Sequence, residues 1–129
     1  MTGVWPIVSY RDARAALVFL SEAFGFEVTA VHPPDEGPVA HAVARWPLGG
    51  GVMFGSAEGV GDPLFANRPP AGQQSLYVVT DDPDGLHDRA VAAGAEIARP
   101  LKDEDYGSRG FTARDPEGNL WSFGTYAGE

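Results

Sequence analysis

The pattern of apolar and polar positions in the first half of the chain predicts a strand, a helix and three further strands. Apolar residues recur at helical spacing, at Ala16, Leu17, Phe19, Leu20, Ala23 and Phe24. Asp12 precedes this run, and its carboxylate can accept hydrogen bonds from the free N–H groups of the first turn. Gly25 ends the helix, because the residue after a helix often needs a positive φ. Extended runs predict strands at 4–10, 26–32, 39–46 and 51–56.

The second half of the chain repeats the first at an offset of 69 positions. The matched pairs include Leu17 with Leu86, Gly25 with Gly94, and Phe54 with Phe123. Asp12 falls on Asp81 at this shift, so either Asp81 or its neighbour Asp82 can cap the second helix. Further strands are predicted at 75–80, 95–99, 110–114 and 120–125. The sequence therefore predicts an α+β fold made of two tandem βαβββ modules.

The 129 residues provide enough chain for one domain, which we expect to span residues 1–129. The first module covers 1–56 and the second covers 73–129. Between them, 57–72 is rich in Gly and Pro, a composition typical of a linker. The stretch 115–119, Asp-Pro-Glu-Gly-Asn, predicts a tight turn before the last strand, because Pro presets φ and Gly supplies a positive φ.

Composition and charge restrict the compartment and the partners. The chain has no cysteine, which excludes disulfides, thiolate metal sites and cysteine nucleophiles. Its formal net charge of -9 repels phosphate backbones, so we expect no nucleic-acid partner, whereas cationic ligands are attracted. The start, MTGVWPIVSY, lacks the pattern of a signal peptide, and the longest apolar stretch, 15–20, is too short to cross a membrane. We expect a cytoplasmic protein with no membrane partner.

Three segments of the chain resemble the vicinal oxygen chelate superfamily, which holds glyoxalase I, extradiol dioxygenases, fosfomycin-resistance enzymes and bleomycin-resistance proteins. These segments are YRDARAALVFLSEAFGFEV, SLYVVTDDPDGLHDRAVAAGAEI and DYGSRGFTARDPEGNLWSFGTY. The resemblance implies that each module curls a mixed sheet into an open half-barrel with one helix on its outer face. It also implies that paired half-barrels enclose a ligand cavity, often across a homodimer.

The resemblance also directs attention to a metal site. Metalloenzymes of this superfamily place His or Gln on the first strand of each module and Glu on its last strand. The matching positions here are Trp5, Ser75 (Gln74 if the register slips by one), Met53 (Phe54 if it slips) and Ser122. Indole, thioether and hydroxyl groups are poor ligands for a hard divalent cation. We therefore expect no metal, no cofactor and no catalytic residue of the family type.

Alternation along the strands predicts which side chains face the cavity. The expected ligand-binding residues are Trp5, Ile7, His41, Trp46, Met53, Ser75, Tyr77, Tyr106, Arg109, Phe111 and Ser122. Within this set, Tyr106, Arg109 and Phe111 are expected to close the mouth of the cavity, and Trp46 to lie at its rim or in an interface. Trp121 and Phe123 are expected to face the helices as core residues.

An aromatic, apolar lining with a few hydroxyls suits a flat organic ligand. The favoured function is a metal-free binding protein that is most similar to bleomycin-resistance proteins and sequesters an aromatic or cationic antibiotic. One alternative is a superfamily enzyme, of the lyase, isomerase or dioxygenase kind, with a noncanonical or absent metal site. Another is a regulatory scaffold whose pocket is vestigial, since a fold does not determine a function.

Overall fold

The computed structural model describes residues 4–56, 72 and 74–128, so nearly all of the expected linker lies outside the described residues. The first module contains β1 (Ile7–Tyr10), α1 (Ala13–Phe19), η1 (Leu20–Phe24), β2 (Glu27–His32), β3 (His41–Arg45) and β4 (Gly51–Ser56). The second contains β5 (Ser75–Val79), α2 (Pro83–Ala92), β6 (Glu96–Asp103), β7 (Arg109–Arg114) and β8 (Leu120–Gly124). Each predicted element is present, with β1 shorter and β6 longer than the sequence indicated.

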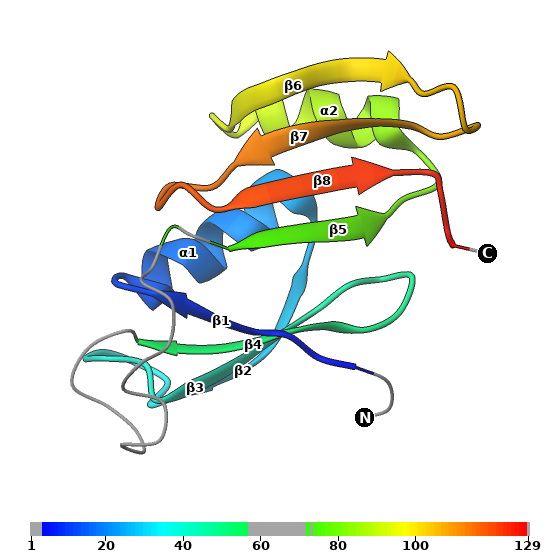
Figure 1. Ribbon diagram of the computed structural model, residues 1–129. Helices are drawn as coiled ribbons and strands as arrows, with labels where there is room; N and C mark the ends of the chain where they lie inside the picture. The colour runs from blue at the N-terminus through cyan, green and yellow to red at the C-terminus, as the bar shows by residue number, and fades with distance from the viewer. Residues whose placement is uncertain (1–3, 57–71, 73, 129) are drawn as a thin grey trace.

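The strands form two four-stranded mixed sheets, shown in Figure 1. The first sheet has the order β1-β4-β3-β2 and the second has the order β5-β8-β7-β6. In each, the first strand of the module pairs in parallel with the last, and the other pairs are antiparallel. This topology confirms the predicted α+β fold of two tandem βαβββ modules.

Aspartate side chains begin both helices, as the sequence predicts. The Asp12 carboxylate accepts from the N–H of Ala15 at 3.1 Å. In the second module it is Asp82, rather than Asp81, that accepts from Gly85, at 3.0 Å. The two caps are therefore 70 residues apart, one more than the repeat offset that the sequence indicated.

The offset changes within the first helix. Ile7 pairs with Met53, and Tyr77 pairs with Ser122, so the first strands correspond at an offset of 70 and the last strands at 69. The first helical segment is thus one residue longer than the second. It ends in a π-helical turn, η1, whereas α2 remains α-helical to its end. A π turn accommodates one extra residue in a helix, and η1 takes up this one.

One hydrophobic core lies between the two sheets and is shared by both modules. Phe24, at the end of η1, packs against Phe123 and Trp121 of β8, with ring centroids 4.7 and 5.7 Å apart. Phe26 extends this cluster to Trp121 and Trp46, at 5.4 and 4.9 Å. Trp121 and Phe123 are at most 1% exposed, which confirms that they face the helices.

The turn at 115–119 joins the modules through a buried carboxylate. Asp115 is 5% exposed and accepts from the Tyr10 hydroxyl of β1. It also accepts from the Trp121 indole and the Asn119 amide, each at 3.0 Å. Burial, together with the negative charge of Asp115, raises the pKa of the Tyr10 hydroxyl. The neutral phenol is therefore the form that the folded protein holds.

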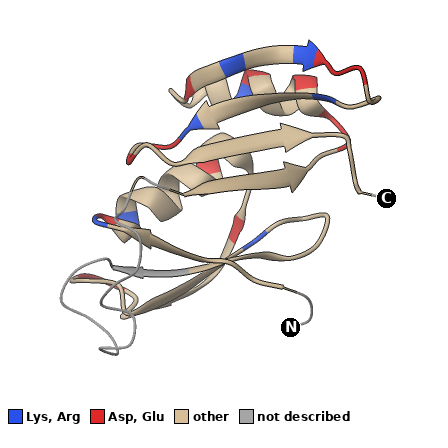
Figure 2. Cartoon of the chain, viewed as in Figure 1, with Lys and Arg blue, Asp and Glu red and all other residues tan. Residues whose placement is uncertain are grey.

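Charged residues are unevenly placed on the fold. Strands β1, β4, β5 and β8 contain no Lys, Arg, Asp or Glu, whereas β6, α2 and the loops carry many, as Figure 2 shows. The uncharged strands are the edge strands β1 and β5 and their direct neighbours β4 and β8. Among the described residues, no helix is long and apolar enough to cross a membrane.

Candidate functional site

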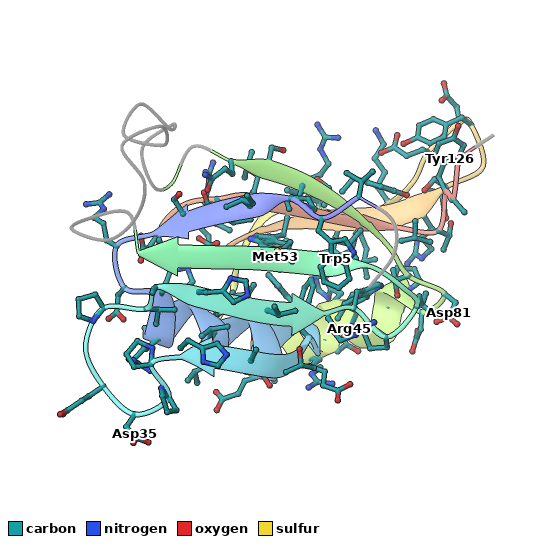
Figure 3. All side chains as sticks on the ribbon, turned by 90° about the horizontal axis from the view of Figure 1, so that it is seen from below. Trp5, Asp35, Arg45, Met53, Asp81 and Tyr126 are labelled. Atoms are coloured by element: carbon teal, nitrogen blue, oxygen red, sulfur yellow. The ribbon has the colours of Figure 1, made fainter. Side chains whose placement is uncertain are left out.

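Each sheet has one face covered by the shared core and one open face. The open face of the second sheet is turned toward the viewer in Figure 1, with α2 behind it. The open face of the first sheet is turned downward in that view and is seen directly in Figure 3, with α1 behind its strands. The two open faces of one chain therefore look in different directions.

The open face of the first sheet is aromatic and apolar. Ile7, which is 53% exposed, lies opposite Met53 of β4. The Trp5 ring lies against the start of β4, where Gly51 makes room for it: a Cβ at that position would come within 2.7 Å of the ring. The guanidinium of Arg45 stands 5.4 Å from the centre of the same ring, a cation–π contact. Trp5 and Met53 share this face in Figure 3.

His41 is the first residue of β3, and Arg45 is the last, so the two lie at opposite ends of this strand. Its ring stacks on that of His32, the residue directly across on β2, with centroids 6.3 Å apart and an interplanar angle of 12°. Both imidazoles are exposed. The structure therefore places His41 at the edge of this face and does not bring it to Trp5.

The open face of the second sheet contains a cavity of about 190 Å³. Four predicted site residues line it: Tyr77, Tyr106, Phe111 and Ser122. The hydroxyls of Thr112 and Ser122 are hydrogen-bonded to each other across β7 and β8, at 2.8 Å. Tyr77 donates its hydroxyl to the carbonyl of Tyr126 at 2.7 Å, which holds the phenol at the side of the cavity. This face is accordingly richer in polar groups than that of the first sheet.

Two of the residues expected at the mouth of the cavity have other positions. The Phe111 ring is 2% exposed and stacks on Phe123 at 5.3 Å, so it belongs to the core beneath the cavity rather than to an open mouth. Arg109 pairs with Asp84 of α2 at 2.8 Å and with Asp103 at 3.3 Å. The bond to Asp84 is the main cause that raises the pKa of the Arg109 guanidinium. Arg109 thus ties β7 to α2.

Trp46 lies at the seam between the modules. Its indole donates to the carbonyl of Val79 on β5 at 2.8 Å. Around it is a cavity of about 470 Å³ whose apolar walls come from both modules, among them Phe26, Leu76 and Trp121. Ser75 is exposed at the start of β5, opposite Leu120. The eleven predicted residues therefore do not form one pocket: most are divided between the two open faces, and Trp46 lies in the seam.

The sequence-based set did not include several residues of these faces, among them Arg45, Arg99 and Thr112. Arg45 and Thr112 follow from strand alternation once the cavity-facing side of β3 and β7 is known. Arg99 faces the cavity of the second sheet, but a bulge shifts its register to Thr112. A bulge adds an unpaired residue, so counting along β6 from the sequence gives the wrong side.

Comparisons with known proteins agree with this architecture. The model of the Glyoxalase/Bleomycin resistance protein/Dioxygenase superfamily matches residues 4–123. The chain belongs to this superfamily. TioX from Micromonospora sp. ML1 has a similar structure, with 32% sequence identity and a TM-score of 0.73 over 95% of this chain and 98% of that one.

Two further proteins are similar to this chain. The glyoxalase/bleomycin resistance protein from Catenulispora acidiphila is 25% identical, with a TM-score of 0.65 over 96% of this chain and 97% of that one. The uncharacterized protein Mb0911c of Mycobacterium bovis is 28% identical over 122 residues, which cover 92% of this chain and 80% of that protein.

Metalloenzymes of the superfamily would hold their ion at positions whose register the structure now defines. Met53 lies on the open face, directly opposite Ile7. Because the first strands of the two modules correspond at an offset of 70, Ser75 is the residue of the second module that corresponds to Trp5. Gln74, the alternative to Ser75, has its side-chain oxygen buried. Indole, thioether and two hydroxyls do not fit a divalent cation. Among the described residues, no group of three His, Asp or Glu side chains could hold one either.

Proposed function

We propose that this superfamily member is a small-molecule-binding protein that holds a flat aromatic ligand without a catalytic metal. The observation that carries the proposal is the Trp5 ring on the open face of the first sheet. The Arg45 guanidinium stands over this ring, and Ile7 and Met53 extend the apolar surface beside it. A flat ring system can stack on such a surface, and a few hydroxyls can orient it.

The proposed site is completed by a second copy of the chain. Within one chain the two open faces look in different directions, so each provides only one wall (Figures 1 and 3). A homodimer that sets the first sheet of one copy against the second sheet of the other would enclose a ligand between Trp5 and the cavity at Ser122. Exposed apolar side chains at Ile7, Leu48 and Tyr77 support such an interface.

Sequestration, rather than turnover, is the role that these side chains support. The charged groups of the open faces are occupied by neighbours in several cases: Arg45 stacks on Trp5, Lys102 pairs with Glu104, and Arg114 pairs with Glu96. The remaining functional groups near Trp5 are its indole and the Met53 thioether, and those near Ser122 are hydroxyls, the Glu104 carboxylate and the Arg99 guanidinium. An aromatic antibiotic is a ligand of the proposed kind.

Calorimetric titration tests the proposal with two probes, naphthalene-2-carboxamide and bleomycin. We expect saturable binding of the flat aromatic probe, and Trp5→Ala should weaken it about tenfold, which corresponds to the loss of ~1.4 kcal/mol of ring contact. Val18→Ala, which changes an exposed residue of α1 outside the proposed site, is the control and should leave the affinity unchanged.

Two outcomes would count against the proposal. One is that neither probe binds the wild-type protein, or that Trp5→Ala and Val18→Ala bind equally well. The other is that exhaustive chelation abolishes binding and elemental analysis finds a stoichiometric divalent ion in protein purified without added metal. Saturable binding of bleomycin would place a cationic antibiotic among the ligands.

A further inference from the structure

The two walls of the proposed site differ in chemistry. The open face of the first sheet offers an indole with the Arg45 guanidinium stacked on it, an aliphatic side chain and a thioether. The cavity on the second sheet is partly lined by aromatic rings as well, but it adds hydroxyls, a carboxylate and a guanidinium, from Ser108, Thr112, Ser122, Glu104 and Arg99. A ligand that contacts both walls therefore needs an apolar end and a polar end.

Arg99 is the group that distinguishes the polar wall. Its guanidinium makes no ion pair with any residue that the structure describes, and its side chain is exposed at the cavity. The other cations of β6 and β7 are engaged: Lys102 with Glu104, Arg109 with Asp84, and Arg114 with Glu96. Arg99 is thus available to a ligand, and guanidinium groups bind carboxylates through two parallel hydrogen bonds.

The hydroxyls beside Arg99 can donate a hydrogen bond to the same ligand carboxylate. Thr112 is the direct partner of Arg99 in the β6–β7 ladder, and its hydroxyl shares one hydrogen bond with that of Ser122. Two hydroxyls have two protons, and their mutual bond uses only one. The other proton can be donated to an oxygen of the ligand.

The acidic groups near this wall do not cancel the charge of Arg99. Glu104, the one carboxylate among the described residues that line the cavity, is paired with Lys102 at 3.6 Å. Glu96 is paired with Arg114 at 2.7 Å. The whole chain has a formal net charge of -9, so an anion is repelled at long range, and only a local cation can favour it.

From this juxtaposition we infer that the protein selects aromatic acids: ligands with a flat apolar body and one carboxylate, which Arg99 binds with help from the Thr112–Ser122 hydroxyl pair. The inference rests on the proposed function, because it assigns the ligand class of the same site. The inferred ligand is an anion, whereas the negative net charge of the chain alone suggests a cationic ligand.

A matched pair of probes tests the inference by calorimetry at neutral pH: naphthalene-2-carboxylate and naphthalene-2-carboxamide. These differ by one charge and hardly in shape. We expect the acid to bind the wild-type protein about tenfold more tightly than the amide, because charge-assisted hydrogen bonds are about twice as strong as neutral ones. Arg99→Gln should weaken binding of the acid about tenfold more than binding of the amide, so that this preference is lost.

Arg99→Lys and Arg11→Gln are the control variants. The lysine keeps the charge without the fork of donors, so it should retain part of the preference for the acid. Arg11 is exposed outside the site, and its substitution changes the net charge by the same amount, so it should leave the preference intact. Thermal unfolding of each variant confirms that it is folded.

The outcomes separate the inference from the proposed function. If the amide binds as tightly as the acid, the inference is wrong and the proposed function stands. If neither naphthalene probe binds, the inference is wrong, and if bleomycin does not bind either, the proposed function is wrong as well. An acid preference that survives in Arg99→Gln, or that Arg11→Gln reduces equally, would also overturn the assignment of the carboxylate to Arg99.

Discussion

Asp115 shows how much a single buried residue contributes to the joining of the modules. It accepts five hydrogen bonds, three of them from the side chains of Tyr10, Asn119 and Trp121 and two from backbone N–H groups. Next to it, the Glu117 carboxylate accepts from the backbone N–H groups of Arg11 and Asp12. The turn of the second module thereby caps the end of β1.

The Tyr10–Asp115 pair predicts a specific dependence of stability on pH. Because burial raises the pKa of Tyr10, the folded protein keeps the phenol protonated, whereas the unfolded chain loses this proton at about pH 10. The contribution of Tyr10 to stability is therefore fully present below about pH 10 and is lost as the pH rises above that value.

We expect the free energy of unfolding of the wild type to fall above about pH 10 by up to about 1.4 kcal/mol per pH unit more than that of Tyr10→Phe. Urea denaturation at several pH values around this point measures both slopes. Parallel slopes for the two proteins would show that the buried phenol does not control the alkaline limit.

Sequence patterns predicted the turn at 115–119 but not the role of Asp115. Pro116 and Gly118 determine the local backbone, which is a property of neighbouring residues. The hydroxyl that bonds to Asp115 comes from Tyr10, 105 residues away in the chain. Such a partner depends on how the two modules pack, and no local pattern contains that information.

At the level of elements, the π turn explains the irregular repeat. The extra residue of the first helical segment is absorbed between Leu20 and Phe24, and Gly25 then ends the segment with a φ of 87°. Arg89 of α2 donates to the carbonyls of Ser21 and Glu22 in this turn, each at 3.0 Å. The wider turn thus presents these two carbonyls to the second module.

Deletion of one residue from each helix tests this account. Deletion of Glu22 should convert the π turn into an α-helical turn and cost no more than about 1–2 kcal/mol, since the flanking residues keep their faces. Deletion of Asp88, equally exposed in α2, should cost about 3 kcal/mol or more, because it rotates buried Ala90 out of the core.

Denaturant unfolding followed by circular dichroism compares the two deletions. The ratio of their effects is the informative quantity, because both remove one exposed acidic residue from a helix. Equal destabilisation would mean that the π turn is required by its surroundings and does not simply accommodate an insertion.

At the scale of the whole molecule, the arrangement of the sheets favours a second copy as the missing wall. Ile7 is the first residue of β1, lies on the open face and is 53% exposed, whereas Val18 of α1 is 55% exposed on the surface of a helix. Ile7→Glu should therefore disrupt the proposed homodimer and weaken ligand binding, while Val18→Glu should do neither. A buried unpaired charge in an interface is costly, whereas a charge on a free surface is not.

Light scattering coupled to gel filtration measures the masses of the wild type and both variants at micromolar concentration. The expected masses are dimeric for the wild type and Val18→Glu and monomeric for Ile7→Glu. A monomeric wild type, or two variants with the same mass, would contradict the proposed assembly.

The amino-acid sequence by itself determined the order of the elements, the duplication, both helix ends and the final turn. These features depend on residues close together in the chain: Asp12 and Gly25 act within one turn of the helix that they bound. Hydrophobic alternation likewise determined that Trp121 and Phe123 face the core, because a strand has only two faces.

Only the tertiary structure decided the register of β1 and β5, the position of Arg99 and the directions of the open faces. A one-residue insertion in a helix, or a bulge in a strand, changes the direction of every later side chain in that element. The amino-acid composition of the segment gives no sign of this change. Whether two open faces meet in one chain or look apart depends on how the helices pack between the sheets. That packing arises from contacts such as Phe24 with Phe123, which bring together residues from the two halves of the chain.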